Sequence, residues 1–551
     1  MVQPPKSANL APSATCRSWS GERSGERSGA DSSVIRPNVS HPDGVVRVQG
    51  VTTYTLRNAS PAKTRCDAVV VGVTSSKKGP VVATGGGDVA KAYGRRLAPL
   101  LATLGFTGKD GETAKVPTGG TIKSPLLVLV GLGEERALTP VGVRRAAGVA
   151  ARTVTNAASV AIALPADSPE LVRAVTEGFA LGGYTFTEYK TDPKPGRTDA
   201  GEVVVLSEQA RKKDTVAAFE RARAVTACVA GARHWVNLPA GDLTPPVFAD
   251  AVVAAHKELT SGRGAPKVGI TVWDEQKLAA EGCGGILAVG KGSEAPPRLV
   301  KLTWEPKGAT RHVALVGKGI TYDSGGYTIK PPASMLHMKE DMAGAATVVQ
   351  ALFLIAQLNL PVRVTAWAPM AENMISGAAM RPGDVLTIRG GTTVEMTNTD
   401  AEGRLILADA LVLAAEEKPD TIVDIATLTG AMVVALGERM AGVMGADDVV
   451  AGLRAAADAA GEAVWPMPIP DEMRERVTSS KVADIAQHDW VRWGGGLFAA
   501  AFLREFTDGI PWGHVDIAGP GFNPGGVHGY TTSGGTGFGV ATLMEYVAAQ
   551  A

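Results

Sequence analysis

Apolar and polar positions along the first part of the chain follow a pattern of short strands separated by helices. The apolar runs have the length and composition of buried strands. They lie at residues 68–73, 126–130, 160–164 and 203–206. Segments with helical spacing lie between them, notably at residues 141–151 and 170–180. This alternation predicts a sheet covered by helices, so residues 51–210 are interpreted as one α/β domain.

A second, larger domain is predicted after a long helix. Residues 213–230 have the pattern of one continuous helix, and residues 211–234 are assigned as the segment that links the two domains. Residues 235–551 are predicted to form a C-terminal α/β domain around a mixed central sheet. Its main expected elements are a buried strand at 312–316, helices at 339–358 and 405–416, and a strand at 512–517. The predicted fold class is therefore α/β, with a smaller N-terminal and a larger C-terminal domain.

The predicted helix at 405–416 is apolar on most of its circumference. Its apolar positions are Leu405, Leu407, Ala408, Leu411, Val412 and Ala415. A helix of this kind is buried on more than one side. Burial would fix the direction of the polar segment that precedes it.

The first 50 residues differ from the rest of the chain. They are rich in Ser, Arg, Gly and Pro, and the tetrapeptide SGER occurs twice in succession. Such a segment has too little apolar content to fold alone, so residues 1–50 are predicted to be a disordered tail. A further hypothesis is that the natural protein begins at Val51. A full-length species in intact-mass analysis of the natural protein would contradict it.

Composition narrows the class of protein. Fifty-five basic residues balance 55 acidic ones, which gives no global electrostatic case for binding nucleic acid or an anionic membrane. The four cysteines are widely spaced and are expected to be reduced thiols, and residues 1–30 lack the apolar region of a Sec-type signal peptide. The longest apolar stretch, at 422–436, is too short and too polar to span a bilayer. A cytoplasmic protein is predicted.

The segment NTDAEGRL at 398–405 carries the strongest chemical signal. It places Asp400, Glu402 and Arg404 at alternating positions within sequence that otherwise appears buried. In an extended chain, alternate residues point to one side, so these three side chains are expected to converge. Buried carboxylates are rare unless they are paired or bind metal. The segment is therefore a candidate metal site.

More charged residues lie upstream, beyond the predicted strand at 312–316. A glycine-rich turn region there contains Lys318, Asp323 and Lys330, and Asp341 lies near the start of the predicted helix at 339–358. In open α/β sheets, ligands bind at such carboxyl ends of strands.

Charge indicates what this set of residues could hold. Four carboxylates would be neutralised by two divalent cations, and oxygen ligands suit Mg or Mn, although Zn also accepts carboxylates. Two metals about 3.5–4 Å apart can bridge a hydroxide and stabilise a hydrolytic transition state. Of Lys318 and Lys330, one is expected to be a neutral amine ligand and the other to stay charged and stabilise an oxyanion.

Both motifs resemble the signatures of the leucyl aminopeptidase family, the two-metal peptidases also called cytosol aminopeptidases. NTDAEGRL matches the best-known signature of that family, and the Lys-to-Asp glycine-rich loop and the segment ending at Asp341 match as well. Further similarity lies at 237–245, 424–431 and 535–540. The resemblance covers roughly residue 230 to the C-terminus. It implies a smaller, variable N-terminal domain similar to a macro domain.

The resemblance also implies a role for each matching residue. Asp323 and Glu402 would bridge the two metals, Lys318 and Asp341 would complete one site, and Asp400 would complete the other. Two residues would act on the reaction itself. Lys330 would polarise the scissile carbonyl, and Arg404 would hold a bicarbonate ion that accepts a proton from water. The residues that would line the pocket for the first substrate side chain are Met338, Thr427 and Gly430. No catalytic position of the family is lost; Tyr322 and Tyr327 are peripheral departures.

Several of these residues have simpler alternatives. Asp400 and Glu402 could be surface charges, Lys330 a solvated loop residue, and Arg404 a salt-bridge partner of Glu402. Surface or structural roles are favoured for His337 and His528, and a packed or hydrogen-bonded role for His514. The Gly85–Gly87 run is interpreted as a loop rather than a phosphate-binding site.

The predicted function is metal-dependent removal of N-terminal amino acids, Leu and other apolar residues above all, from peptides with a free amino terminus. Mn or Zn are the expected metals, with Mg or Co as further options. The resemblance implies a homohexamer. Two alternatives stay open: a dipeptidase role such as cysteinylglycine cleavage, and DNA binding, which the balanced charge disfavours.

Overall fold

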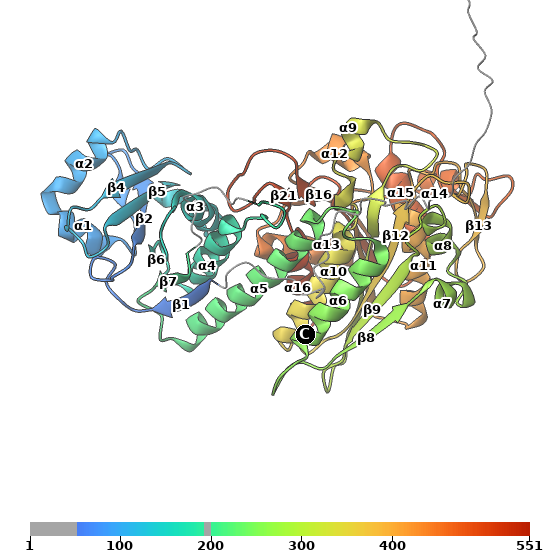
Figure 1. Ribbon diagram of the computed structural model, residues 1–551, viewed down its shortest axis with the longest axis horizontal. Helices are drawn as coiled ribbons and strands as arrows, with labels where there is room; N and C mark the ends of the chain where they lie inside the picture. Colours follow the sequence, from blue (N-terminus) through green and yellow to red (C-terminus); the bar gives the residue numbers. More distant parts are fainter. Residues whose placement is uncertain (1–51, 192–199) are drawn as a thin grey trace, which may run out of the picture. The chain divides into compact units, whose positions relative to one another are not determined.

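The computed structural model describes residues 52–191 and 200–551. The predicted tail at residues 1–50 lies outside this range. The described residues form two α/β domains, as predicted, and each domain has a central sheet covered by helices on both faces (Figure 1). Within the described residues, no helix has the length and apolar character needed to cross a membrane.

The N-terminal domain contains a seven-stranded sheet in the order β1-β7-β6-β2-β5-β4, with β3 paired to β2. Its strands are β1 (Thr53–Arg57), β2 (Ala68–Ser75), β3 (Val81–Val82), β4 (Thr113–Pro117), β5 (Leu126–Glu134), β6 (Ser159–Ala163) and β7 (Glu202–Leu206). Its helices are α1 (Gly87–Tyr93), α2 (Leu97–Thr103), α3 (Pro140–Thr153) and α4 (Pro169–Gly183). Helices α3 and α4 cover one face and α1 and α2 the other. All four predicted strands and both predicted helices are present.

Capping residues explain where the two long helices of this domain begin. The side chains of Thr139 and Ser168 accept hydrogen bonds from backbone N–H groups in the first turns of α3 and α4, and a proline occupies the first helical position of each. Side-chain caps of this type and a proline at that position both favour a helix start. Helix α5 (Lys213–Asn237) then follows, and it extends seven residues beyond the predicted end at residue 230.

The C-terminal domain is built on a nine-stranded mixed sheet in the order β17-β16-β19-β15-β10-β12-β9-β8, with β11 also paired to β12. Its strands are β8 (Val268–Trp273), β9 (Arg298–Trp304), β10 (His312–Gly317), β11 (Gly319–Asp323), β12 (Arg363–Asn373), β15 (Thr421–Ala426), β16 (Ala441–Gly445), β17 (Val464–Pro466) and β19 (Trp512–Asp516). The smaller sheets consist of β13 (Val385–Thr387), β14 (Thr393–Glu395) and β18 (Ile485–Ala486), and of β20 (Phe522–Asn523) and β21 (Gly534–Gly535). The predicted mixed central sheet is therefore confirmed.

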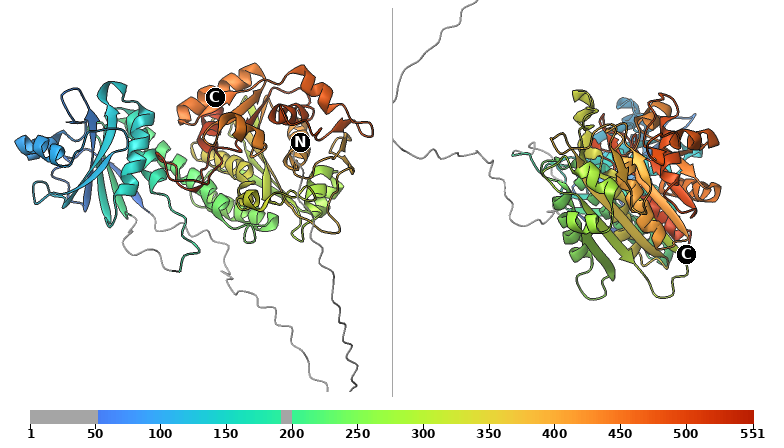
Figure 2. Two further views of the ribbon diagram at one scale, coloured as in Figure 1. Left: turned by 90° about the horizontal axis from the view of Figure 1, so that it is seen from above. Right: turned by 90° about the vertical axis from the view of Figure 1, so that its right-hand side faces the viewer.

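Helices cover both faces of this sheet (Figure 1, Figure 2). One layer, together with α5, contains α6 (Pro245–Leu259), α10 (Ala343–Gln357), α13 (Asp447–Ala460) and α16 (Val540–Ala548). The other contains α7 (Glu275–Ala280), α8 (Gly284–Gly290), α11 (Gly403–Glu416), α12 (Gly430–Leu436), α14 (Asp471–Val477) and α15 (Gly495–Arg504). Alternate residues of β10 pack into the two layers: Val313 and Leu315 into the first, Ala314 and Val316 into the second. A strand buried on both faces requires the continuous apolar run seen in the sequence.

Two predicted elements differ from the structure near the strand ends. The glycine-rich region after β10 is partly a strand, because β11 continues along β12 after a break at Lys318. The predicted helix at 339–358 is shorter: a 3-10 helix, η3 (Met338–Glu340), comes first, and α10 begins at Ala343. Asp341 thus lies in the turn between the two helices. Of the remaining helices, α9 (Pro332–Met335) is a single turn.

Candidate metal centre

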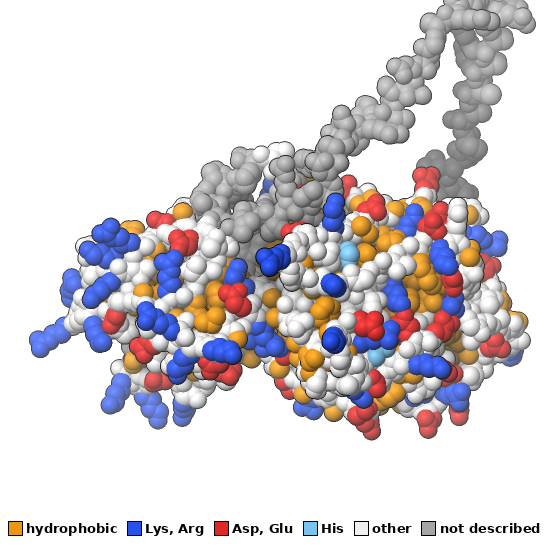
Figure 3. Space-filling view, turned by 90° about the horizontal axis from the view of Figure 1, so that it is seen from below, with side chains coloured by type: hydrophobic (Ala, Val, Ile, Leu, Met, Phe, Trp, Pro, Cys, Tyr) orange, Lys and Arg blue, Asp and Glu red, His pale blue; other side chains and the backbone are white. Residues whose placement is uncertain are grey.

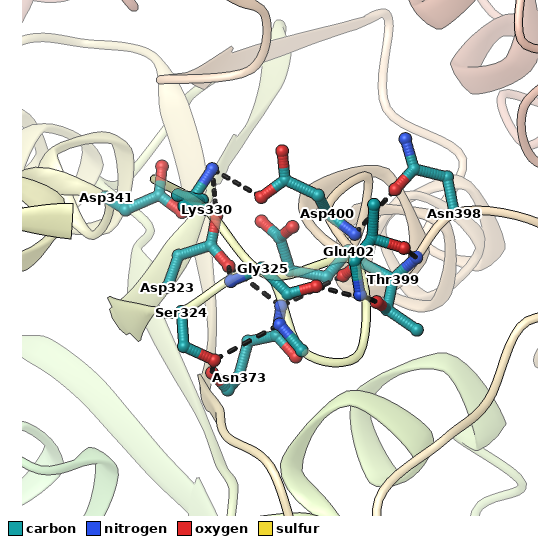
Figure 4. Close-up of polar contacts among 12 residues, drawn as sticks. Asp323, Ser324, Gly325, Lys330, Asp341, Asn373, Asn398, Thr399, Asp400 and Glu402 are labelled. Carbon is teal, nitrogen blue, oxygen red and sulfur yellow. Dashed lines mark hydrogen bonds and ion pairs between the residues drawn. The ribbon is translucent and has the colours of Figure 1, made fainter. Parts of the chain in front are cut away.

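Three segments of the C-terminal domain bring the predicted charged residues together. Lys318 lies between β10 and β11, and Asp323 ends β11. Asp341 follows η3, while Asp400 and Glu402 lie in the loop that precedes α11. Figure 4 shows the carboxylates of the four acids facing a common space. Oxygens of Asp323, Asp400 and Glu402 lie within 4.8 Å of one another.

The two lysines connect these acids in different ways. Nζ of Lys318 lies 2.8 Å from Oδ1 of Asp341 and 3.0 Å from Oε1 of Glu402. Nζ of Lys330 lies 2.8 Å from Oδ2 of Asp323 and 2.6 Å from Oδ1 of Asp400. Burial opposes the charge on each ammonium group, but the surrounding carboxylates outweigh burial and raise the pKa of both Lys318 and Lys330. Each pair of acids therefore shares one cationic side chain.

The acids carry more negative charge than the lysines compensate. Burial, reinforced by Glu402, raises the pKa of Asp323 to about 6, and burial also raises the pKa of Asp341 well above its usual range. Burial opposes ionisation of Glu402 too, but Lys318 and Lys330 outweigh it and lower the pKa of Glu402. Four carboxylates around two ammonium groups leave an excess of negative charge in a buried space, which disfavours ionising all four without further cations.

Unpaired oxygens show that the site fits metal ions. Among the described residues, Oδ2 of Asp341 and Oε2 of Glu402 are buried and have no hydrogen-bond partner. Buried polar atoms are normally paired, so an unpaired pair of carboxylate oxygens requires an explanation. Oxygen ligands grouped in this way are suited to divalent cations. The donor set and the excess negative charge both fit such ions.

The backbone around Asp323 forms a tight turn that aims its carboxylate. Oδ1 of Asp323 accepts hydrogen bonds from the N–H of Gly325 at 2.9 Å and from Nδ2 of Asn373 at 2.8 Å. Gly325 and Gly326 have φ values of 84° and 60°, in the left-handed region that glycine tolerates. Glycine is needed at this turn, because a side chain at Gly325 would also meet the carboxylate of Asp400.

The predicted alternation of Asp400, Glu402 and Arg404 along an extended chain is not observed. Residues 400–404 are not extended: Asp400 lies in a turn, Glu402 has helical backbone angles, and Arg404 belongs to the first turn of α11. Helical rotation replaces the two-residue alternation of a strand, so these three side chains do not follow the predicted pattern. Nη1 of Arg404 donates to the backbone carbonyl of Gln487 at 2.8 Å, and its guanidinium lies over the ring of Phe498.

The environment of Arg404 is unusual for a buried cation. Its side chain is buried, and within residues 52–191 and 200–551 it forms no ion pair with a carboxylate, so the alternative of a salt bridge to Glu402 is not observed. Its Nε is buried without a hydrogen-bond partner, and burial lowers the pKa of Arg404 to about 10. An anion would satisfy this guanidinium.

The predicted pocket residues lie beside the acids to different degrees. Thr427 is in contact with them: its hydroxyl donates to Oδ1 of Asp341 at 2.8 Å, and its carbonyl accepts from Nζ of Lys318 at 2.9 Å. Met338 is half-buried at the start of η3, and its carbonyl accepts the N–H of Asp341. Gly430 is exposed at the first position of α12.

His514 has a hydrogen-bonded structural position, as predicted. Nδ1 of His514 lies 2.6 Å from Oδ1 of Asp424, and Oδ2 of Asp424 accepts from Nε1 of Trp512. All three side chains are buried. This polar group lies within the sheet, where β15 and β19 pair.

Sequence reasoning missed the amide side chains that hold the acidic loop. Nδ2 of Asn373 bridges Asp323 and the carbonyl of Thr399, and the side chain of Gln487 bonds to the backbone on the other side of the loop. Asn373 lies at the end of a long apolar segment, a position that could have indicated a polar side chain at the carboxyl end of a buried strand. Gln487 gave no such indication.

Comparison with known proteins identifies the family to which this chain belongs. A model of the cytosol aminopeptidase family catalytic domain matches residues 230–544, and a model of the N-terminal domain of the same family matches residues 70–193. A probable cytosol aminopeptidase from Streptomyces griseus is 49% identical over 513 residues, covering 90% of this chain and 98% of that protein. One from Clavibacter michiganensis is 48% identical, covering 88% and 95%.

A solved structure is similar across both domains. The bottromycin maturation enzyme BotP in complex with Mn is 36% identical, with a TM-score of 0.76, and the match covers 88% of this chain and 99% of that one. The family models, the curated relatives and this structure all indicate the same family. The chain therefore belongs to the cytosol aminopeptidase family and is a metal-dependent aminopeptidase.

Proposed function

We propose that this enzyme uses two metal ions, bound by the four acids and Lys318, to hydrolyse the first peptide bond of its substrates. Asp323 and Glu402 would be shared by the two ions, Lys318 and Asp341 would complete one site, and Asp400 would complete the other. The unpaired, buried oxygens of Asp341 and Glu402 carry this proposal. When bound, the two ions supply Lewis-acid activation of water and of the scissile carbonyl.

Exposure separates the roles of the two lysines. The side chain of Lys318 is 3% exposed, whereas that of Lys330 is 16% exposed. Lys330 is therefore the ammonium group that a substrate can reach. It donates a hydrogen bond to the scissile carbonyl oxygen and stabilises the negative charge that develops there. Lys318, enclosed by Asp341, Glu402 and the carbonyl of Thr427, is the candidate amine ligand.

Arg404 is proposed to hold a bicarbonate ion that accepts a proton from the attacking water. A buried guanidinium with an unpaired Nε and no carboxylate partner among the described residues supports an anion at this position. A bound base would also explain why the catalytic step needs no histidine.

The substrates are proposed to be peptides with a free amino terminus, with Leu and other apolar residues favoured. Met338, Thr427 and Gly430 would line the pocket for the first side chain. Mn is the favoured metal because a similar structure contains it, with Zn next and Mg or Co as further options. We further propose that the enzyme is a cytoplasmic homohexamer and that it acts in peptide turnover.

Hydrolysis of leucine p-nitroanilide tests the proposal. Metal-stripped protein is assayed with and without added Mn²⁺ or Zn²⁺, next to the Asp400→Ala variant and an N-acetylated substrate. We expect turnover that depends on metal and is lost in both controls. Metal-dependent cleavage of the N-acetylated substrate would contradict the requirement for a free amino terminus, and inactivity with every metal would refute the peptidase.

The two alternatives are separable from this function. Cleavage of cysteinylglycine but not of longer peptides would indicate the dipeptidase. On the face shown in Figure 3, Lys and Arg side chains predominate over the N-terminal domain, which keeps DNA binding as a second candidate. A gel shift that weakens steeply with salt would support it.

A further inference from the structure

A single glutamine is hydrogen-bonded along the loop that carries two of the proposed metal ligands. We call residues 397–402, which contain Asp400 and Glu402, the acidic loop. It begins where β14 ends, and β14 pairs in parallel with β18. The last backbone hydrogen bond of this ladder runs from the N–H of Gln487 to the carbonyl of Glu395 at 2.9 Å. Beyond it, the described structure shows no further strand pairing along the acidic loop.

Beyond the end of the strand pairing, the side chain of Gln487 forms the hydrogen bonds to the backbone of the acidic loop. Its Oε1 accepts the N–H groups of Thr397 and Asn398 at 3.2 and 3.1 Å. Its Nε2 donates to the carbonyls of Asn398 and Ala401 at 2.7 and 2.8 Å. A carboxamide offers two donors and two acceptor lone pairs, and here all four are used. The side chain is fully buried, so water does not compete for these partners.

The acidic loop is held from its other side by Asn373. Its Nδ2 donates both to Oδ1 of Asp323 and to the carbonyl of Thr399 (Figure 4). Asn373 therefore ties the loop to the strand end that carries Asp323. Among residues 52–191 and 200–551, the side chain of Gln487 bonds to no carboxylate; its partners there are backbone groups of the acidic loop.

The backbone of Gln487 extends the same support to the proposed bicarbonate site. Its carbonyl accepts Nη1 of Arg404 at 2.8 Å. One residue thus fixes the backbone on either side of Asp400 and also the guanidinium of Arg404. The contact to Arg404 uses the backbone carbonyl and the contacts to the acidic loop use the side chain, so a side-chain substitution removes only the latter.

We infer that Gln487 is a positioning residue of the metal site: its carboxamide sets the backbone of the acidic loop so that Asp400 and Glu402 meet Asp323. The inference rests on the proposed two-metal function. In the described structure, the side chain of Gln487 bonds to the backbone of the acidic loop, so it acts on Asp400 and Glu402 through that backbone. Residues that orient metal ligands typically change metal affinity or activity about 10- to 100-fold when substituted.

Two substitutions distinguish the contribution of the accepting oxygen of the carboxamide from that of its donating nitrogen. Gln487→Glu keeps an oxygen that accepts the N–H groups of Thr397 and Asn398, but it places a second oxygen against the carbonyls of Asn398 and Ala401. Gln487→Met keeps the length of the side chain and removes all four hydrogen bonds. Gln350→Met is the matched control, because Gln350 is another buried glutamine, on α10, with no contact to the acidic loop in the described structure.

The first measurement is Mn²⁺ affinity of the full-length protein by titration calorimetry, with the electron paramagnetic resonance spectrum of bound Mn²⁺ as a second readout. We expect both Gln487 variants to bind Mn²⁺ about 10- to 100-fold more weakly than wild type and to show an altered spectrum. Gln350→Met should match wild type in both. Folded Gln487 variants with Mn²⁺ affinity within about threefold of wild type and an unchanged spectrum would overturn the inference.

Hydrogen exchange of the metal-free protein gives a readout independent of metal. The amides of Thr397 and Asn398 should exchange faster in Gln487→Met than in wild type, and stay protected in Gln487→Glu. Equal protection in Gln487→Met and wild type would contradict the hydrogen bonds on which the inference depends. Neither readout requires peptide hydrolysis. A wild-type protein that binds Mn²⁺ but cleaves no peptide would therefore refute the proposed function and leave the inference about Gln487 intact.

Discussion

A charge placed at Leu411 is predicted to abolish activity by unfolding the enzyme rather than by altering its chemistry. Leu411 lies in the middle of α11, the helix that follows the acidic loop, and its side chain is 0% exposed within the apolar layer on that face of the sheet. Truncating a fully buried leucine to alanine costs about 2–5 kcal/mol. Leu411→Asp adds the cost of placing a carboxylate among the buried apolar side chains of that layer.

These magnitudes set the expected result. Total stability of a folded protein is about 5–15 kcal/mol, so Leu411→Asp should remove most of it. For Leu411→Ala, a loss of about 3 kcal/mol at about 2–4 °C per kcal/mol lowers Tm by about 6–12 °C. Val412→Ala is the control on the same helix, because Val412 is only partly buried and should cost about 1 kcal/mol or less.

Thermal melts followed by circular dichroism, with hydrolysis of leucine p-nitroanilide measured well below Tm, test the reasoning. Leu411→Ala should keep near wild-type activity per folded molecule while its Tm falls. A Leu411→Asp protein with unchanged Tm and no activity would refute the structural role of this side chain.

Three further predictions concern the metal site and the sheet. Gly403→Ala should weaken Mn²⁺ binding with little change in Tm, because the added carbon would lie 2.4 Å from Cε and 2.6 Å from Nζ of Lys318; calorimetry with unchanged affinity would contradict it. Mn²⁺ at about 100 times its Kd should stabilise the protein by about 2.7 kcal/mol, seen as a higher Tm that chelator reverses; the absence of any shift would refute the metal site. For His514, burial opposes the imidazolium, but Asp424 outweighs burial and raises the pKa. The stability from this pair is therefore complete below the unfolded pKa of about 6.5 and is lost as pH rises through the higher folded pKa. Asp424→Asn should be most destabilised relative to wild type at low pH, and urea melts showing an equal difference at pH 6 and pH 9 would count against this.

Much of the fold could be predicted because its strands are buried on both faces. A strand such as β10, whose alternate residues pack into two helical layers, must be apolar throughout, and that run is visible in the sequence. The four acids and two lysines were also recognisable, since charged residues next to such strands need partners. Their grouping in space agrees with the prediction.

The path of the chain between these residues was harder to predict. The segment at 400–404 has strand-like alternation of charge, yet α11 begins at Gly403 and Arg404 belongs to its first turn. Tertiary packing of the apolar helix α11 determines where the helix begins, and the local charge pattern does not reveal that packing. Gln487 was missed because its partners lie almost ninety residues earlier in the chain, and an isolated glutamine in a polar segment gives no sign that it will be buried.

The order of strands in the central sheet has a consequence for how the enzyme folds. β10 lies between β12 and β15, so Val313 pairs with both Val364 and Thr421, and the acidic loop comes from chain between these two partners. Parallel pairing over such sequence separations is slow, because loop-closure entropy opposes these contacts. We expect the acids to meet only when this part of the sheet is complete, so that the metal site is not yet formed in the folding transition state. A metal ion bound there should slow unfolding without accelerating folding, and thus prolong the lifetime of a mature molecule.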